Sequence, residues 1–281
     1  MIERFYLFTT CIKSDSSKEL RRLVDSLRKY DNHDEISLVH IILLQNVSSD
    51  DIEKIQKDIS FPSFSKILNV SNIVSLSKAR NIMLKYAREN IPEFILPGSV
   101  IGFPDDDCWF PDGLIENISE TMFNEELEFL FFKYGSSPED FSDRGSLIAA
   151  RYKSVVLNVC SITMFLKSEL VNQLGGFNEL LGVGARYNGG EDLNYGLKAF
   201  LVSKSSAWFD SKLIGHADKP SGNKGRYYLG SALSLKKFSL TSPAAFVIYI
   251  RKLIIGVLLV GTLKMQFKKL YLLMRVDSSD V

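Results

Sequence analysis

IGFPDDDCWF, residues 101–110, joins an apolar run to three adjacent aspartates, and the interpretation of the whole chain starts from this junction. The residues 99–103 are typical of a buried strand, and Pro104 ends it. Three neighbouring carboxylates repel one another unless a cation neutralises them, and hard divalent cations prefer oxygen ligands. Aspartates are also common in turns before helices, so a helix cap with spare charge is the alternative. From this stretch alone both interpretations stay open.

Strand-like and helix-like patterns alternate before the three aspartates. The expected strands are 4–10, 37–44, 66–70 and 99–103, and the expected helices are 17–30, 50–58 and 77–89. This order predicts a parallel sheet wound with helices. Ligands bind such a sheet outside the carboxyl ends of its strands, which is where the aspartates follow.

After the aspartates, PDGL at 111–114 predicts a helix whose first turn holds Pro111 and Asp112. Strand-like runs follow at 127–134 and 156–166. A loop with six glycines between Gly175 and Gly190 then ends in GGED, which predicts the start of a helix through Phe200. A strand-like SKLIGH ends at His216. The body of the chain therefore reads as α/β throughout.

Beyond Arg226 the pattern changes to successive helices, so we expect domains at 1–225 and 226–281. From Leu235 to Arg275 there are eight lysines or arginines and no acidic residue, which leaves a net charge of −7 on the remainder of a chain whose total is +1. The apolar run 244–263 contains Arg251 and Lys252, and such charges are costly at a bilayer centre.

The following segment is amphipathic when drawn as a helix. Its apolar face holds Phe267, Leu270, Tyr271 and Met274, and its basic face holds Lys264, Lys268 and Arg275. This pattern predicts helices that lie on an anionic lipid surface. An ordinary helical appendage or an oligomer interface is the alternative.

Composition limits the remaining function classes. With 281 residues and 46% hydrophobic content, the chain can bury one large α/β core. Its total charge gives no indication of nucleic-acid binding, and we expect none. The three cysteines lack metal-ligand spacing and the N-terminus lacks a signal-peptide pattern, so we expect reduced thiols and a cytoplasmic protein.

Two further features could supply chemistry. In GGED, the glycines let the backbone approach a ligand, and a carboxylate at a helix N-terminus stays ionised, as a general base must be. An acidic helix cap is the alternative. His216 is one of three histidines, and it is either an ordinary loop residue or, beside an aspartate-bound cation, a nitrogen ligand for a metal such as Mn²⁺.

Four motifs in this order carry a resemblance. They are SLSKARNIMLKYA (75–87), IGFPDDDCWFPD (101–112), GGFNELLGVGARYNGGEDLNYGLKA (175–199) and GH (215–216). Together they resemble family 2 glycosyltransferases of the GT-A fold, a Rossmann-like nucleotide-binding sheet flanked by helices, and most closely the bacterial type that builds O-antigen, capsule or exopolysaccharide. The resemblance covers roughly residues 4–220.

The resemblance implies an inverting, metal-dependent transferase of the hexosyltransferase type (EC 2.4). Asp105 and Asp107 match the ends of the DxD motif and His216 matches a later metal ligand, so these residues would hold Mn²⁺ or Mg²⁺, a Lewis acid for the leaving group. Asp192 matches the base that takes the acceptor proton, and Glu191 would position the acceptor.

The donor and acceptor residues follow in the same way. The expected donor-binding residues are Thr9, Thr10, Gln45, Arg80, Asp105 and Asp106, and the expected acceptor-binding residues are Trp109, Gly189, Gly190 and Glu191. Family members usually carry an acidic residue near the end of the second strand that pairs with uracil or thymine, whereas this chain has Gln45 and Asn46 there. An amide can also pair with a base edge, so a UDP- or dTDP-sugar is expected and the nucleotide stays open.

Trp109 either stacks on a sugar ring or anchors the following helix, and the loop 182–190 could close over the acceptor. The basic tail fits a lipid-linked saccharide acceptor and peripheral association with the inner face of the cell membrane.

Two alternative functions belong to other classes of protein. A sugar nucleotidyltransferase should carry a Gly-rich basic loop after the first strand, where this chain has TTCIKSDSS, and a non-catalytic membrane scaffold does not need Asp107, Asp192 and His216 together.

Overall fold

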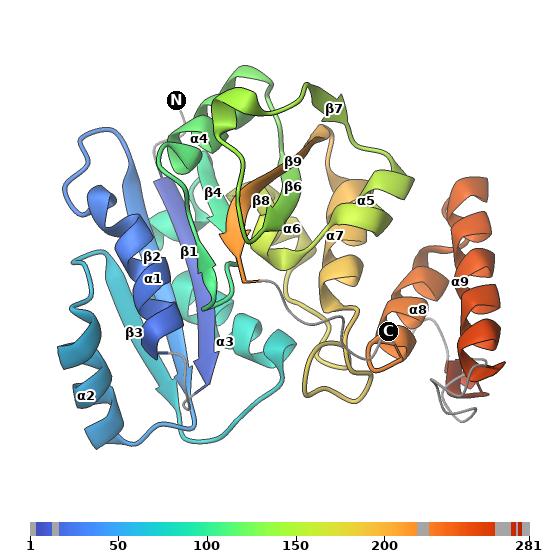
Figure 1. Cartoon of the computed structure of the whole chain (residues 1–281), viewed down its shortest axis with the longest axis horizontal. Helices are drawn as coiled ribbons and strands as arrows, with labels where there is room; N and C mark the ends of the chain where they lie inside the picture. The colour runs from blue at the N-terminus through green and yellow to red at the C-terminus, as the bar shows by residue number, and fades with distance from the viewer. Residues whose placement is uncertain (1–3, 13–16, 218–224, 262–270, 274, 277–281) are drawn as a thin grey trace.

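The computed structural model describes residues 4–12, 17–217, 225–261, 271–273 and 275–276 (Figure 1). The strands are β1 (Arg4–Ile12), β2 (Ser37–Gln45), β3 (Ser65–Val70), β4 (Ser99–Gly102), β5 (Cys108–Trp109), β6 (Phe129–Gly135), β7 (Leu147–Ala149), β8 (Met164–Lys167) and β9 (Ser206–His216). The helices are α1 (Ser17–Leu27), α2 (Ser49–Ile59), α3 (Leu76–Asn90), α4 (Leu114–Asn124), α5 (Tyr152–Asn158), α6 (Ser168–Leu174), α7 (Glu191–Val202), α8 (Tyr228–Phe238) and α9 (Pro243–Gly261).

These strands form one sheet in the order β3-β2-β1-β4-β8-β6-β9-β5, with β7 paired to β9. The first four strands are parallel, as the alternating sequence pattern predicts. β8 is antiparallel to both β4 and β6. β5 is antiparallel to β9 and sets Cys108 opposite His216. This last pairing brings the aspartate stretch to the end of β9.

Helices cover both faces of the sheet, and successive side chains of β1 enter different cores. Phe5 and Leu7 pack in a cluster with α1 and α4, whereas Tyr6 and Phe8 pack in a cluster with α3, α6 and α7. This alternation follows from the two-residue repeat of a strand, and burial on both faces explains why the parallel strands are apolar throughout. The predicted α/β class is confirmed.

Two predicted elements differ from the structure. The helix after the aspartates begins at Leu114, preceded by Gly113 in a left-handed conformation (φ 77°), so Pro111 and Asp112 lie in the turn before it. The run 156–166, predicted as a strand, is helical up to Asn158 and becomes extended only from Met164. Its β-branched residues favour a strand, but packing decides the helix, because Tyr152 and Val155 of α5 are buried in the core that also holds residues of α7.

The C-terminal helices pack against the α/β body. Leu235 and Phe238 of α8 and Ala245 of α9 share the core that contains Tyr6 and Phe8. The Ser234 hydroxyl donates to the Gly190 carbonyl over 2.8 Å, which fixes α8 to the residue that precedes α7. Helix α8 is therefore part of the surroundings of the glycine loop.

Of the residues predicted to lie on lipid, Lys264, Phe267, Lys268, Leu270 and Met274 fall outside the described residues. Tyr271 and Arg275 are described, and both are exposed. In the described part of the chain, no helix has both the length and the apolar character that crossing a bilayer requires.

Candidate active site

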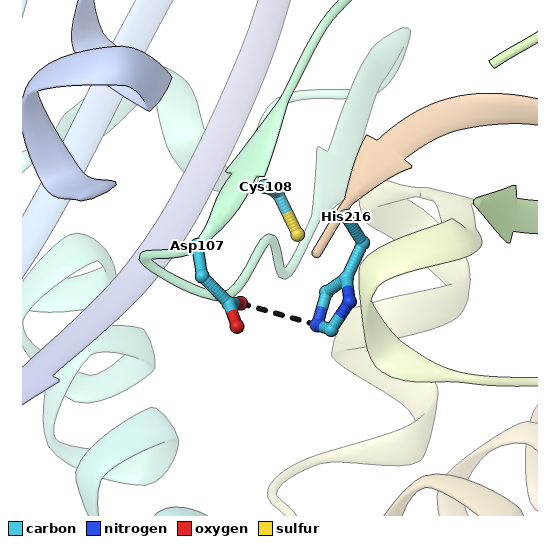
Figure 2. A group of neighbouring side chains, drawn as sticks. All are labelled: Asp107, Cys108 and His216. Atoms are coloured by element: carbon cyan, nitrogen blue, oxygen red, sulfur yellow. Dashed lines mark ion pairs between the residues drawn. The ribbon is translucent and has the colours of Figure 1, made fainter. Parts of the chain in front are cut away.

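The sequence-predicted polar residues gather where β1, β2, β4 and β9 end. Asp105, Asp106 and Asp107 follow β4, His216 is the last residue of β9, and Asp192 lies in the first turn of α7. Figure 2 shows Asp107, Cys108 and His216 converging from two neighbouring chain segments. The edge at which ligands bind an open α/β sheet is therefore the edge that carries these carboxylates.

Asp107 and His216 form a buried pair. Asp107 Oδ1 lies 3.1 Å from His216 Nε2, and both residues are less than 9% exposed (Figure 2). His216 Nδ1 lies 2.7 Å from the Ala217 carbonyl oxygen. A carbonyl can only accept, so Nδ1 carries a proton. In neutral imidazole, Nε2 then points a lone pair at a carboxylate oxygen.

Two acceptors facing each other in this way need a proton or a cation between them. Two ligands at right angles around one Mg²⁺, each about 2.1 Å from it, lie roughly 3 Å apart. The measured 3.1 Å matches that spacing. Cys108 Sγ joins the pair, since the three ligand atoms all lie within 4.8 Å of one another. Carboxylate, imidazole and thiol are a chemically suitable donor set for a divalent transition metal.

A second charged cluster surrounds Arg80. This guanidinium is 2% exposed and donates to Asp192 Oδ1 over 2.8 Å, to Ser161 Oγ over 2.6 Å and to Asp105 Oδ1 over 3.4 Å. Asp192 is 112 residues away in sequence. Burial alone would lower the pKa of Arg80, but the Asp192 and Asp105 charges raise it, so this cation is permanent.

Two neighbours of Asp192 have raised pKa values. Burial, followed by the Asp192 charge, raises the pKa of Glu191 to about 7, against the opposing effect of Arg80. Burial and the Asp192 charge also raise the pKa of the Cys160 thiol well above its ordinary value. That thiol donates to Asp192 Oδ2 over 3.4 Å. Both oxygens of Asp192 are thus oriented by donors.

The middle aspartate has a different environment. Burial, together with the Asp105 charge, raises the pKa of Asp106 to about 6. Arg22 of α1 donates to the backbone carbonyl of Asp107 over 2.6 Å, and its guanidinium lies 3.9 Å from the centre of the Trp109 ring. α1 therefore holds the aspartate turn in place.

The predicted donor residues on β1 and β2 are joined to each other. The Thr9 hydroxyl donates to the Pro104 carbonyl over 3.0 Å and lies 2.9 Å from His40 Nε2, and burial lowers the pKa of His40 to about 3. Gln45 donates to Thr10 Oγ1 over 2.6 Å and accepts from the Val74 amide over 2.8 Å. These bonds fix the carboxyl ends of β1, β2 and β4 relative to one another.

The predicted acceptor residues lie around the same edge. The Trp109 ring packs against Gly215, where an added Cβ would lie 1.9 Å from a ring carbon. Gly189 and Gly190 both have positive φ (85° and 83°), and a Cβ on Gly190 would lie 2.3 Å from the backbone of Gly230. Glycine is required at 190 by both conformation and space.

Four residues that complete the site were not predicted from the sequence. Cys108 was expected to be a reduced thiol without metal-ligand spacing, but it lies with Asp107 and His216. Arg22, Cys160 and Ser161 reach it by packing from α1 and from the turn after α5, and no local motif marks them.

The comparisons with known proteins agree on one family and one fold. Residues 9–166 match the family model for glycosyl transferase family 2. The solved structure of S. aureus TarS 1-349 has a TM-score of 0.60 at 16% identity, covering 83% of this chain and 64% of that chain. TarS 1-349 in complex with UDP-GlcNAc gives 0.61 at 16% identity, covering 83% and 66%. No curated protein matches the chain in sequence.

A longer TarS structure gives a TM-score of 0.59 at 15% identity, covering 84% of this chain and 40% of that chain. The chain thus spans less than two thirds of the length of each of these TarS chains. At such identities the likeness concerns the fold, and it agrees with the predicted GT-A architecture of a sheet flanked by helices.

Proposed function

The chain belongs to glycosyl transferase family 2, and we propose that it is an inverting transferase that moves a sugar from a nucleotide-sugar donor to an acceptor hydroxyl. One observation carries the proposal. The same sheet edge holds Asp107 beside His216 and, separately, Asp192 beside Arg80. The first pair suits the diphosphate end of a donor, and the second suits a base.

Asp192 would take the proton of the acceptor hydroxyl. The hydroxyl oxygen forms a bond to the anomeric carbon of the donor, the bond from that carbon to the diphosphate oxygen breaks, and the nucleoside diphosphate leaves. Arg80 donates to one oxygen of Asp192 and the Cys160 thiol donates to the other, so the base is oriented before the acceptor arrives. Glu191, protonated up to about pH 7, can donate a hydrogen bond to the acceptor.

Asp107 and His216 would hold a divalent cation, Mn²⁺ or Mg²⁺, with Cys108 near it, whereas Asp105, also predicted as a ligand, lies beside Arg80. When bound, such a cation neutralises charge that develops on the leaving diphosphate. The hexosyltransferase subtype and the surface-polysaccharide role predicted from the sequence belong to this proposal.

For the donor we propose a UDP-sugar, with UDP-GlcNAc as the first candidate. The support is the TarS complex with UDP-GlcNAc, whose fold this chain shares. Thr9 and Gln45 would act by fixing the strand ends that shape the base pocket, since each is less than 2% exposed and already bonded within the protein. Thr10, which is partly exposed, is the side chain of this group best placed to meet a nucleotide.

For the acceptor we propose a lipid-linked saccharide at a membrane surface. The outer side of α9 carries six apolar side chains that are 37–64% exposed: Phe246, Val247, Ile250, Ile254, Val257 and Leu258. The same helix carries Arg251 and Lys252, and the described residues of α8 and α9 include no acidic residue. Lys252 lies over the Tyr228 ring of α8, so the exposed Arg251, next to Ile250, is the cation that adjoins the apolar stripe. An exposed apolar stripe beside a cation suits an anionic bilayer. Substituting Ile254 and Val257 with glutamate should abolish co-flotation with anionic vesicles.

The transferase proposal is tested by metal-dependent binding and slow hydrolysis of UDP-, dTDP- and GDP-sugars, with Asp107→Ala as the variant. Binding of one nucleotide class, dependent on Mn²⁺ and lost in the variant, is the expected result. A folded protein that binds none of these donors with metal present would contradict the proposal and favour a scaffold.

A further inference from the structure

A cleft of about 500 Å³ lies between the glycine loop and the C-terminal segment. Its walls are Leu180, Arg186, Tyr187, Leu272, Arg275 and Val276. The floor of the cleft is well packed. Tyr187 is buried in a small core with α8 residues, and Leu180, Leu272 and Val276 pack against that core.

Both walls of the cleft are fixed to the body of the protein. Lys236 of α8 donates to the carbonyls of Leu273 and Val276 over 3.2 and 2.6 Å, which holds the segment that carries Arg275. The Tyr187 amide donates to the Leu180 carbonyl over 2.8 Å, which closes the loop that carries Arg186. The two arginines therefore face one space from two anchored elements.

Among the described residues that line the cleft, the charged side chains are both arginines. In the described part of the chain, neither Arg186 nor Arg275 makes an ion pair, and each guanidinium instead lies beside a tyrosine ring, at 5.3 and 4.8 Å. The sequence from Lys219 to Val276 holds eleven lysines or arginines and no aspartate or glutamate. Two exposed guanidinium groups without an acidic partner are a strong attraction for an anion, above all a phosphate.

Besides the two arginines, the lining consists of Tyr187 and three aliphatic side chains, which limits the chemical class of the ligand. Two arginines over a wall of two leucines and a valine match a phosphate that continues into a hydrocarbon chain. The position is also informative, because the loop that forms one wall runs directly into the first turn of α7. A Cβ placed on Gly182 of this loop would lie 3.5 Å from Glu191 Cβ.

We propose that this cleft binds the phosphate group of an amphiphile, with Arg186 and Arg275 on the anion and the aliphatic wall along the chain. The inference rests on the proposed function, in which the acceptor is lipid-linked, and it identifies where the lipid phosphate of that acceptor is held. The acceptor saccharide then extends along the glycine loop toward Asp192.

The test uses the full chain without divalent cation, so that the Asp107 site does not compete. Binding of farnesyl monophosphate is measured by calorimetry for the wild type and for Arg186→Gln, Arg275→Gln and Arg226→Gln. Arg226 is the matched control, because it is exposed, lies in the same basic stretch and sits 5.5 Å from a tyrosine ring, but does not line the cleft. We expect about tenfold weaker binding for each cleft variant and no change for the control.

Two further arms identify the source of the phosphate. Farnesol, which lacks the anion, should not bind. Flotation with phosphatidylcholine vesicles, with and without phosphatidylglycerol, tests the headgroup: vesicle binding that depends on both cleft arginines, without farnesyl phosphate binding, assigns the cleft to bilayer phospholipid.

Equal losses in all three variants, or a wild type that binds neither probe, would overturn the inference. Donor binding by the same wild-type sample separates this result from a failure of the proposed function. A protein that binds donor but no amphiphilic phosphate loses only the cleft assignment.

Discussion

Asp107 and Asp192 lie at the same edge of one sheet, yet the protein compensates their charges in different ways. Asp192 faces Arg80 at 2.8 Å, a cation that cannot lose its proton. Asp107 faces His216 at 3.1 Å, a residue whose Nδ1 proton is committed to a backbone carbonyl. The base end of the site therefore pairs a carboxylate with a permanent cation, whereas the aspartate end pairs a carboxylate with an imidazole.

This difference explains why three aspartates can follow a buried strand. Asp105 is within 3.4 Å of Arg80, Asp106 takes a proton below about pH 6, and Asp107 is beside His216. Each carboxylate has its own means of compensation, and only one of them calls for a metal. Substitutions at the two ends should accordingly fail in different ways.

The largest effect is expected at the base. Asp192→Asn keeps an oxygen for Arg80 to donate to, but removes the proton acceptor, so turnover should fall by about 10²–10⁴-fold while the donor dissociation constant stays unchanged. Steady-state kinetics and donor calorimetry measure the two quantities. Equal loss of donor binding would show that Asp192 belongs to the donor end instead.

Arg80→Met tests whether the Arg80 cation compensates the negative charges of Asp192 and Asp105. Removing the buried guanidinium leaves Asp192 and Asp105 without their cation, and breaking a buried ion pair typically costs about 3–5 kcal/mol in the free energy of unfolding. Chemical denaturation measures the change. Lys85→Met on the same helix is the matched control, because its pair with Glu89 is exposed and should contribute less than about 1 kcal/mol. Similar losses in both variants would contradict the proposed role.

His216→Asn tests the opposite end. At a Mn²⁺ concentration about 100 times the dissociation constant, the metal should stabilise the wild type by about 2.7 kcal/mol and the variant by much less. His33→Asn is the control, since His33 lies before β2, away from the carboxyl edge. Thermal melts with and without Mn²⁺ decide the point, and undiminished stabilisation of the His216 variant would rule out this site.

The smallest effect concerns Glu191. Its pKa is raised to about 7 in the folded protein, so the unfolded chain ionises first as pH rises from about 4.5, and the stability that the protonated group contributes is lost as pH passes through 7. Glu191→Gln should flatten this dependence. Between about pH 5 and about pH 8, the free energy of unfolding should fall by on the order of 2 kcal/mol more in the wild type than in the variant. Denaturation at both pH values measures it, and an unchanged pH dependence would contradict the assignment.

Much of the fold was predictable because it depends on local pattern. The first four strands and their helices lie within two or three residues of their predicted bounds, and the helix after GGED runs from Glu191 to Val202. The two-residue strand β5 and the three-residue β7 were missed, since so few residues show no period. The helix α5 was missed because burial of Tyr152 and Val155 in the core shared with α7 outweighs the strand preference of its valines.

The sequence by itself determined the chemistry at the sheet edge: three aspartates after a strand, a glycine-rich approach to Asp192, and a basic C-terminal region. Only the tertiary structure decided which charged side chains pair with one another. Pairing of β5 with β9 places Asp107 near His216, and the fold brings Arg80 of α3 within hydrogen-bond distance of Asp192 at the start of α7. Local patterns report periodicity and turn chemistry, whereas charge partners far apart in sequence are set by how layers pack, and burial then fixes their protonation.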